Sequence, residues 1–298
     1  MIQVSHLSKK FGTLTAVDDL TFEVQPGRVT GFLGPNGAGK TTTLRIGLDL
    51  VRADSGTVTF DGRHYHQLPK PMSHVGAALE ATGFHPGRSA RDHLLTMAPQ
   101  AGVPDQRCDE VLELVGLKEA ARKRVKGFSM GMRGRLSLAA TLLADPQILL
   151  LDEPTNGLDP EGIAWMRGLL RHLADEGRTI LISSHLLSEV QQTVDDVIII
   201  GHGRLLHASP LADLARLTRQ RTWVTPIDPK ALLDLARQMN WTLERTPDPS
   251  TAQIVGPTPA EIGHACFAAG VELRQLAPQS QGLEDTFLAL THGQEAIR

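Results

Sequence analysis

The chain has 298 residues, of which 41% are hydrophobic and 21% charged, a composition that suits a folded globular protein with one large domain or two smaller ones. Its formal net charge of −3 provides no basic footprint, so no nucleic-acid partner is expected. Cys108 and Cys266 lack a metal-ligand spacing, which favours a reducing compartment. The N-terminus has no signal-peptide core, and no apolar run approaches the roughly 20 residues that span a bilayer. A role at a membrane therefore requires another chain as an anchor.

Two kinds of strand are predicted along the first two thirds of the chain. Alternating apolar and polar residues predict half-buried strands at Ile2–Leu7, Leu20–Val24 and Thr57–Phe60. Near-continuous apolar runs predict strands of a parallel sheet that is buried on both faces. These runs are Val29–Leu33, Ile148–Leu151, Thr179–Ile182 and Val197–Ile200. Helical patterns at Thr41–Leu50, Glu161–Asp175 and Leu186–Gln192 lie between them and indicate an α/β fold with crossover helices.

Two regions follow other patterns. Residues 88–145 carry little strand signal and predict a helical insertion, with helices at Arg91–Met97, Asp105–Val115 and Met132–Leu143. A boundary near Ser209-Pro210 separates residues 1–209 from a tail, residues 210–298, whose βαββαβ order fits a small ferredoxin-like domain. The predicted tail elements are strand Arg221–Thr225, helix Lys230–Met239, strands Trp241–Glu244 and Ala252–Val255, helix Ala260–Ala268, strand Val271–Leu276 and a last helix around Leu283–Leu290.

The segment GPNGAGKTT matches the phosphate-loop pattern G-x-x-x-x-G-K-[ST], directly after an apolar strand and before a helical pattern. Its glycines allow backbone amides to approach phosphates, and the helix N-terminus adds a positive electrostatic end. Lys40 is expected to reach the β- and γ-phosphates, Thr41 to bind Mg²⁺ and Thr42 to donate to a phosphate oxygen. The flanking strand and helix disfavour the alternative, a glycine-rich turn that binds nothing. The candidate nucleotide-binding residues here are Gly34, Pro35, Asn36, Gly37, Ala38, Gly39, Lys40, Thr41 and Thr42.

Two carboxylates end the apolar strand of ILLLDEP. Asp152 is expected to hold the water shell of Mg²⁺. Glu153 points the other way on an extended chain, where it can orient and deprotonate an attacking water. The alternative is an ordinary strand end followed by an acidic turn. His185 and Asp159 likewise have structural alternatives, as part of a polar strand-to-helix turn and as a helix cap before Pro160.

Together with FSMGMRGRL, Phe128–Leu136, these segments resemble the nucleotide-binding subunit of ATP-binding cassette (ABC) transporters over about residues 1–209. The resemblance implies a P-loop NTPase fold of the ABC type, with a parallel core sheet, an antiparallel β subdomain and the helical subdomain at about 88–145. The tail would be a small C-terminal α+β domain. ATP and Mg²⁺ are the implied ligands. Phe11 would stack on adenine, Glu153 would be the catalytic glutamate, and His185 the switch histidine that contacts the γ-phosphate and the attacking water. Asp159 would end the D-loop, Asn156–Asp159.

Two departures from the family pattern point to one branch. Glu80 in VGAALEATGF stands where a glutamine usually binds Mg²⁺ or water, and a carboxylate can still bind the ion; a solvated loop residue is the alternative. In Phe128–Leu136, hereafter the signature, Ser129 and Gly131 keep the positions that reach the γ-phosphate bound by the opposite subunit. Met130 and Met132 replace the usual residues. The combination resembles the bacitracin- and lantibiotic-resistance and drug-export branch.

The resemblance also implies partners. Two chains would join head to tail, as a homodimer or as a heterodimer with a similar chain, and would drive a separate membrane permease, for export rather than import. The chain would then be cytoplasmic, at the inner face of the cell membrane. One alternative is a soluble ABC-type ATPase that acts on ribosomes or DNA without a permease, and another is a binding module that barely hydrolyses ATP. The tail would pack against the core or its dimer mate, or sense a ligand, and His64 with His66 would form a metal site only if their segment is extended.

Overall fold

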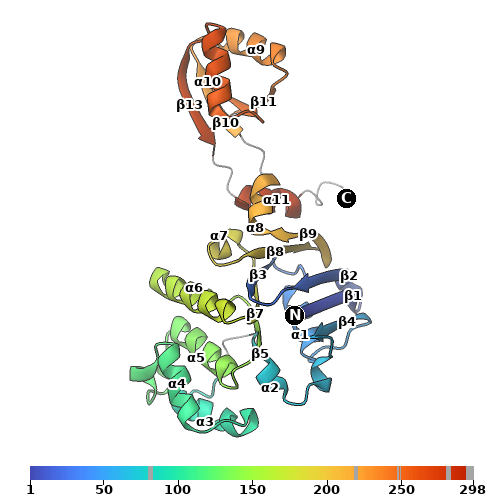
Figure 1. Ribbon diagram of the computed structural model, residues 1–298, viewed down its shortest axis with the longest axis vertical. Helices are drawn as coiled ribbons and strands as arrows, with labels where there is room; N and C mark the ends of the chain where they lie inside the picture. Colours follow the sequence, from blue (N-terminus) through green and yellow to red (C-terminus); the bar gives the residue numbers. More distant parts are fainter. Residues whose placement is uncertain (80–82, 218–220, 247, 249, 280–282, 293–298) are drawn as a thin grey trace. The chain divides into compact units, whose positions relative to one another are not determined.

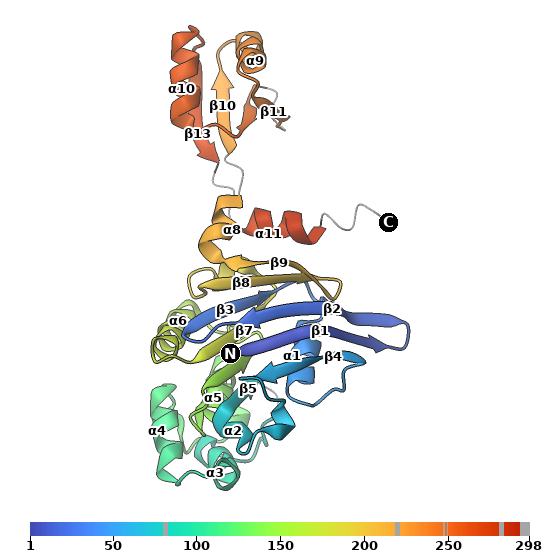
Figure 2. The same ribbon diagram turned by 45° about the vertical axis from the view of Figure 1, so that its right-hand side comes forward.

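The computed structural model describes residues 1–79, 83–217, 221–246, 248, 250–279 and 283–292 (Figures 1 and 2). The chain divides into two compact units, one formed by Met1–Leu211 with the C-terminal residues from Leu290, the other by Ala212–Ala289. The larger unit carries every residue proposed from the sequence for nucleotide binding. Within the described residues, no helix is both long and apolar enough to cross a membrane.

A six-stranded sheet forms the centre of the larger unit, in the order β5-β6-β7-β3-β8-β9. The strands are β3 (Arg28–Leu33), β5 (Val75–Ala78), β6 (Ile148–Leu151), β7 (Thr179–Ser184), β8 (Asp196–Gly201) and β9 (Arg204–Pro210). All neighbours pair in parallel except β8 and β9. The apolar runs predicted β3, β6, β7 and β8 but not β5 and β9. β5 is short and rich in small residues, and β9 lies at the sheet edge with most of its side chains partly exposed, so neither carries a buried-strand pattern.

An antiparallel sheet, β2-β1-β4, lies beside this centre and shares its core. It contains β1 (Ile2–Phe11), β2 (Leu14–Val24) and β4 (Ser55–Phe60). Phe22 of β2 and Phe32 of β3 pack with ring centroids 5.1 Å apart, which joins the two sheets through apolar contact. Helix α1 (Lys40–Gly47) follows β3, and α6 (Pro160–Asp175) packs against β3 and β7. The short helices α2 (Pro71–His74) and α7 (Leu187–Val190) complete this part.

The sequence analysis allowed a metal site at His64 and His66 only if their segment is extended, and the structure does not show an extended segment. Residues 65–67 form the 3₁₀ helix η1 (Tyr65–Gln67), so the segment is not extended. His64 and His66 stack instead, with ring centroids 5.6 Å apart. Among the residues that the structure describes, no group of three His, Cys, Asp or Glu side chains could hold a metal ion.

Helices form the segment that the sequence predicted to be helical. They are α3 (Ala90–Ala101), α4 (Gln106–Leu114) and α5 (Met130–Leu142), with the 3₁₀ turns η2 (Lys118–Ala120) and η3 (Val125–Gly127). Ser89 caps α3 by accepting from the Asp92 N–H, and Leu94, Leu112 and Leu136 are buried where the three helices meet. The helical segment therefore has its own packed interior, from which α5 also contacts β5.

The smaller unit contains a four-stranded antiparallel sheet on which two helices pack. The sheet and these helices are β10 (Arg221–Pro226), α9 (Pro229–Gln238), β11 (Thr242–Arg245), β12 (Ala252–Val255), α10 (Pro259–Ala268) and β13 (Leu273–Gln279). Helices α8 (Leu211–Leu217) and α11 (Leu283–His292) lie at the two ends of this segment of the chain. The strand order β11-β12-β10-β13 is that of a split βαβ, ferredoxin-like sheet. Asp228 and Thr258 cap α9 and α10, and both helices pack on a core that contains Val224, Ile254 and Ile262.

Candidate nucleotide-binding site

The phosphate loop joins β3 to α1 and runs close to β2. Gly37 and Gly39 have φ angles of 81° and 106°, a left-handed conformation that side chains disfavour. A Cβ on Gly39 would also lie only 2.4 Å from the Ala16 carbonyl oxygen. Gly39 is the N-cap of α1, and no side chain caps this helix end. The first-turn N–H groups are therefore placed to bind an anion.

A hollow of about 300 Å³ lies over this loop. Its lining consists of Phe11, Leu14, Ala16, Asn36, Gly37, Ala38, Gly39, Lys40, Thr41, Thr42 and Glu153. Phe11 ends β1 and is 49% exposed, so an aromatic ring borders the hollow at the loop. The stacking of Phe11 on adenine stays a prediction, as does the contact of Thr42 with phosphate.

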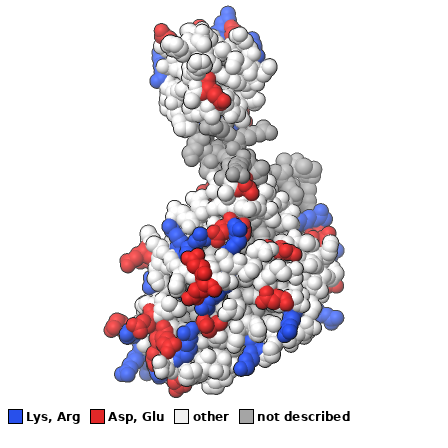
Figure 3. Space-filling model, viewed as in Figure 1, with Lys and Arg blue, Asp and Glu red and all other residues white. Residues whose placement is uncertain are grey.

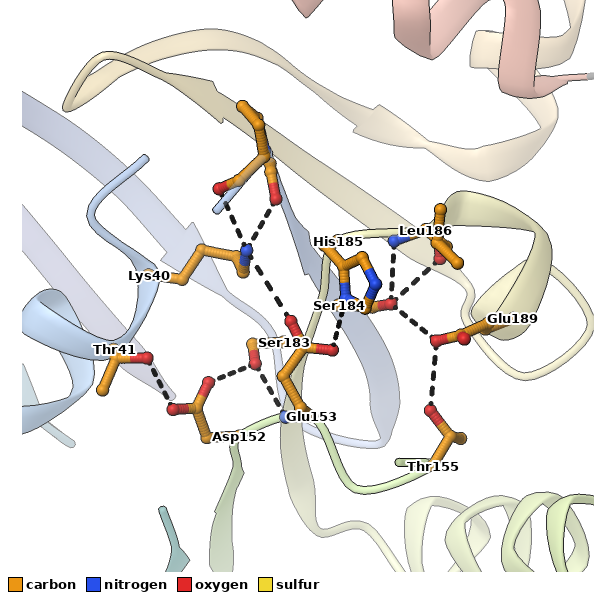
Figure 4. A network of polar contacts seen from close by, with 12 residues as sticks. Lys40, Thr41, Asp152, Glu153, Thr155, Ser183, Ser184, His185, Leu186 and Glu189 are labelled. Carbon is orange, nitrogen blue, oxygen red and sulfur yellow. Dashed lines mark hydrogen bonds and ion pairs between the residues drawn. The ribbon is translucent and has the colours of Figure 1, made fainter. Parts of the chain in front are cut away.

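Lys40 is 6% exposed and contacts both the loop and the acidic strand end. Its Nζ donates to the carbonyl oxygens of Gly34 at 2.6 Å and Pro35 at 3.3 Å, and lies 3.7 Å from Glu153 Oε1 (Figure 4). Burial lowers the pKa of the Lys40 amine, while the negative charges of Glu153 and Asp152 oppose that shift. Lys40 thus lies on the loop that would carry the phosphates, beside the carboxylate proposed to activate water.

Thr41, which lines the hollow, contacts Asp152. The Thr41 hydroxyl donates to Asp152 Oδ2 at 2.6 Å, although 111 residues separate them in the chain. A hydroxyl and a carboxylate oxygen are hard ligands of the kind Mg²⁺ prefers, so this pair fits the ion. Mg²⁺ binding by Thr41 and Asp152 stays a prediction. Glu80, the third proposed ligand, lies outside the described residues.

Glu153 and His185 contact each other directly. His185 Nδ1 lies 2.9 Å from Glu153 Oε2, and both side chains are partly buried. Glu153 does not continue the strand, as the extended-chain expectation required, because its φ angle is 49°. This left-handed conformation costs a non-glycine residue roughly 1–2 kcal/mol, so the surrounding contacts must hold it. It leaves the carboxylate between Lys40 and His185 (Figure 4).

Three hydroxyl groups that hold this network, those of Ser183, Ser184 and Thr155, were not predicted from the sequence. The Ser183 hydroxyl donates to Asp152 Oδ1 and accepts from the Glu153 N–H at 2.9 Å. The Ser184 hydroxyl donates to Glu189 Oε2 at 3.2 Å, and Thr155 donates to the same oxygen at 3.3 Å. The only sequence signal was the pair of serines directly before the histidine in ISSH. The Ser183 partners, Asp152 and Glu153, lie about thirty residues away along the chain and become visible only when β6 and β7 pair.

The signature lies elsewhere in the same unit. Ser129 caps α5 by accepting from the Met132 N–H at 3.2 Å, and a Cβ on Gly131 would lie 3.3 Å from the Gly157 carbonyl oxygen. Neither residue is among those that line the hollow. Asp159 accepts from the Gly162 N–H at 2.8 Å and so forms the helix cap that was its structural alternative.

Comparison with known proteins identifies the family. A family model described as ABC transporter matches residues 17–156. The chain is 44% identical over 223 residues to a bacitracin transport ATP-binding protein of Bacillus licheniformis, which covers 74% of this chain and 73% of that protein. The chain belongs to the ABC transporter ATP-binding proteins. A bacitracin transport ATP-binding protein of Enterococcus faecalis is 33% identical over 298 residues, or 98% of this chain and 97% of that one. A lantibiotic transport ATP-binding protein of Streptococcus pyogenes is 36% identical over 206 residues, covering 69% and 89%.

Solved structures agree with this membership. The structure of an ATP-binding subunit of an ABC transporter superposes with a TM-score of 0.66 at 25% identity, covering 72% of this chain and 92% of that one. A dimeric ABC cassette in a post-hydrolysis state with ADP and Pi has the same fold, with a TM-score of 0.64 at 22% identity, covering 71% and 99%. The predicted ABC-type nucleotide-binding fold and the resemblance to the bacitracin and lantibiotic branch are therefore confirmed. This ABC subunit binds ATP, and its family and fold imply ATP hydrolysis. ABC cassettes work as dimers with a transmembrane partner.

Proposed function

We propose that this subunit hydrolyses ATP in the hollow over the phosphate loop and thereby powers a separate permease that exports a drug, a peptide antibiotic or a similar compound. The observation that carries the hydrolysis is the meeting of Lys40, Thr41, Asp152, Glu153 and His185 in one network, from three separate segments of the chain. The names of the relatives, which refer to bacitracin and lantibiotic transport, support an exported antibiotic.

Each side chain of the network has a part in the proposed reaction. Lys40 binds the β- and γ-phosphates, and for that its amine must leave the carbonyls of Gly34 and Pro35. Glu153 orients the attacking water and accepts its proton, while His185 holds the Glu153 carboxylate at 2.9 Å. Thr41 and Asp152 would hold Mg²⁺, which neutralises charge on the phosphates when it is bound.

Each ATP site is completed by the signature of a second chain, which is another copy of this chain or a similar one. Ser129 and Gly131 do not line the hollow of their own chain, which supports a head-to-tail dimer with two composite sites. In that arrangement the Ser129 hydroxyl and the backbone at Gly131 approach the γ-phosphate across the interface. ATP then joins the two chains and its hydrolysis releases them.

An apolar groove of about 520 Å³ is the proposed docking place for the permease. It lies between the core and the helical segment, and its lining includes Leu48, Leu50, Tyr65, Met72, Phe84, His93 and Met97. Leu50 is 66% exposed, and such apolar surface is typical of a site for a partner helix. Basic and acidic side chains intermingle on the face of the larger unit shown in Figure 3, which supports a permease over nucleic acid as the partner.

An ATPase assay tests the enzymatic part of the proposal. The wild-type chain is expected to release phosphate from ATP in the presence of Mg²⁺, and Glu153→Gln to abolish turnover while ATP binding persists. Turnover that survives in Glu153→Gln would remove Glu153 from its proposed role.

Co-expression with a candidate polytopic permease tests the transport part. Wild-type chain should lower bacitracin accumulation in cells, Glu153→Gln should not, and uptake in place of efflux contradicts export. Leu50→Glu should break coupling, whereas Leu205→Glu, at a partly exposed leucine of β9, serves as the matched control. An ATPase that binds ribosomes and no permease would favour the soluble alternative.

A further inference from the structure

Ser183 connects the two carboxylates of the site through a single hydroxyl. It lies near the end of β7 and is fully buried. Its hydroxyl donates to Asp152 Oδ1 and accepts from the backbone N–H of Glu153 at 2.9 Å. Figure 4 shows the Ser183 side chain between these two residues, on the side away from Thr41. A hydroxyl can donate and accept at once, so one small group satisfies both partners.

The strand register places Ser183 at this point. In the parallel pairing of β6 and β7, Leu151 lies opposite Ile182, so the next residues, Asp152 and Ser183, are also level. On its other side, β7 pairs with β3, where Ser183 lies opposite Phe32, two residues before the phosphate loop. Ser183 therefore occupies the strand that separates the acidic strand end from the strand carrying the loop.

The first consequence concerns Asp152. Its two carboxylate oxygens have different partners, Ser183 at Oδ1 and Thr41 at Oδ2. Together they fix the plane of the carboxylate and leave Oδ2 on the side of Thr41. Partners behind a metal-binding carboxylate orient it in this way, and their loss typically lowers metal affinity or activity about 10- to 100-fold.

The second consequence concerns Glu153. Its left-handed backbone needs support, and the bond from its N–H to Ser183 is one contact that supplies it. In this conformation the carboxylate lies 2.9 Å from His185 Nδ1 and 3.7 Å from Lys40 Nζ. Without the Ser183 oxygen the backbone can relax, and the carboxylate then leaves the position from which it would activate water.

We infer that Ser183 is a positioning residue for ATP hydrolysis, which sets the direction of the Asp152 carboxylate and the backbone conformation of Glu153. The inference rests on the proposed function, because it concerns the same reaction. Ser183 does not contact the substrate in this scheme. Threonine can replace its donor and acceptor, whereas alanine and valine cannot.

The test compares Ser183→Ala and Ser183→Thr with wild type in the whole 298-residue chain. Ser183→Ala should lower kcat about 10- to 100-fold, with a change of less than about threefold in KM for ATP. Ser183→Thr should restore most of kcat. Thr30→Val is the matched control for loss of a buried sheet hydroxyl, because the Thr30 hydroxyl has no hydrogen-bond partner among the described residues.

A binding measurement separates positioning from a general loss of structure. With a fluorescent ATP analogue, titration of Mg²⁺ reports the concentration at which the ion half-maximally alters nucleotide binding. Ser183→Ala should raise this concentration about tenfold or more, and Thr30→Val should leave it unchanged, because the Thr30 hydroxyl has no hydrogen-bond partner among the described residues. If Ser183→Ala does not fold, Ser183→Cys, which fills the site with a slightly larger thiol and weakens both hydrogen bonds, replaces it in both assays.

The outcomes are distinct. A Ser183→Ala variant with wild-type kcat and wild-type Mg²⁺ dependence overturns the inference, and so does a Ser183→Thr variant no better than alanine when both bind nucleotide normally. Equal losses in kcat for Ser183→Ala and Thr30→Val would show a structural role only. If the wild-type chain itself does not hydrolyse ATP, the proposed function fails instead.

Discussion

His185 Nδ1 lies 2.9 Å from Oε2 of Glu153, at the point where the loop after β7 meets the end of β6. Lys40 contacts the other oxygen of the same carboxylate at 3.7 Å. The carboxylate is thus held between the Lys40 amine and the His185 imidazole. In the proposed reaction, this arrangement would keep the carboxylate near the γ-phosphate and leave His185 to control its direction.

Replacement of His185 should therefore impair turnover more than binding. We expect His185→Ala to lower kcat about 100-fold, in the range for loss of acid–base positioning, with little change in ATP affinity measured by calorimetry. His172→Ala, at an exposed histidine of α6 that pairs with Glu176, is the control and should behave as wild type. Equal effects of the two substitutions would contradict a role for His185 in the site.

Removal of the Glu153 charge should trap the ATP-bound dimer. Glu153→Gln keeps the shape of the side chain but cannot accept the proton from water, so ATP should persist at the interface. Sedimentation with ATP and Mg²⁺ should show a dimer, and ADP should return it to monomers. A variant that stays monomeric at high concentration, even with its permease, would rule out the closed dimer.

ATP affinity should depend on the protonation of Lys40. Burial lowers its pKa from 10.5, so the amine loses its charge at a lower pH than an exposed lysine does. Bound phosphate favours the charged form, and affinity should be constant below the Lys40 pKa and fall by up to about tenfold per pH unit above it. Calorimetry over alkaline pH measures this decline, which should be absent in Lys40→Met. An unchanged slope in that variant would assign the titration to another group.

The same shift predicts a change in stability of the nucleotide-free chain. Because the folded pKa of Lys40 is lowered, the charged amine costs stability below that pKa, and the cost is relieved as pH rises toward 10.5. Lys40→Met removes this term, so the unfolding free energy of wild type should rise relative to that of the variant as pH increases from neutral toward 10.5. Urea titrations at several pH values measure the unfolding free energies of both chains. A difference between wild type and Lys40→Met that stays constant with pH would show that Lys40 does not contribute.

Gly157 should tolerate no side chain next to Met130. Its φ angle is 75°, and an added Cβ would lie 2.3 Å from Met130 Sδ. Gly157→Ala should therefore lower the unfolding free energy by roughly 1–2 kcal/mol for the backbone strain alone, plus the cost of moving Met130. Met130→Ala in the same chain should recover only the second part, as urea unfolding of the two single variants and the double variant can measure. Full recovery would show that the strain at Gly157 is negligible.

The local patterns of the sequence identified the parts of the site that depend on consecutive residues. GPNGAGKTT predicted a tight loop before a helix because glycine conformations and helix starts are local properties. The apolar runs predicted β3, β6, β7 and β8 because strands buried on both faces need apolar residues throughout. They missed β5 and β9, whose pairing comes from neighbouring strands rather than from their own composition.

By itself, the sequence determined the family, the phosphate loop and the buried strands, because each is written in adjacent or regularly spaced residues. Only the tertiary structure decided that the Glu153 backbone is left-handed and that His185 reaches the Glu153 carboxylate. It also decided that the Ser183 hydroxyl connects the Glu153 N–H to the Asp152 carboxylate. These relationships depend on the register between β6 and β7, strands separated by a helix in the chain. Register follows from the packing of the whole sheet, which no short segment encodes.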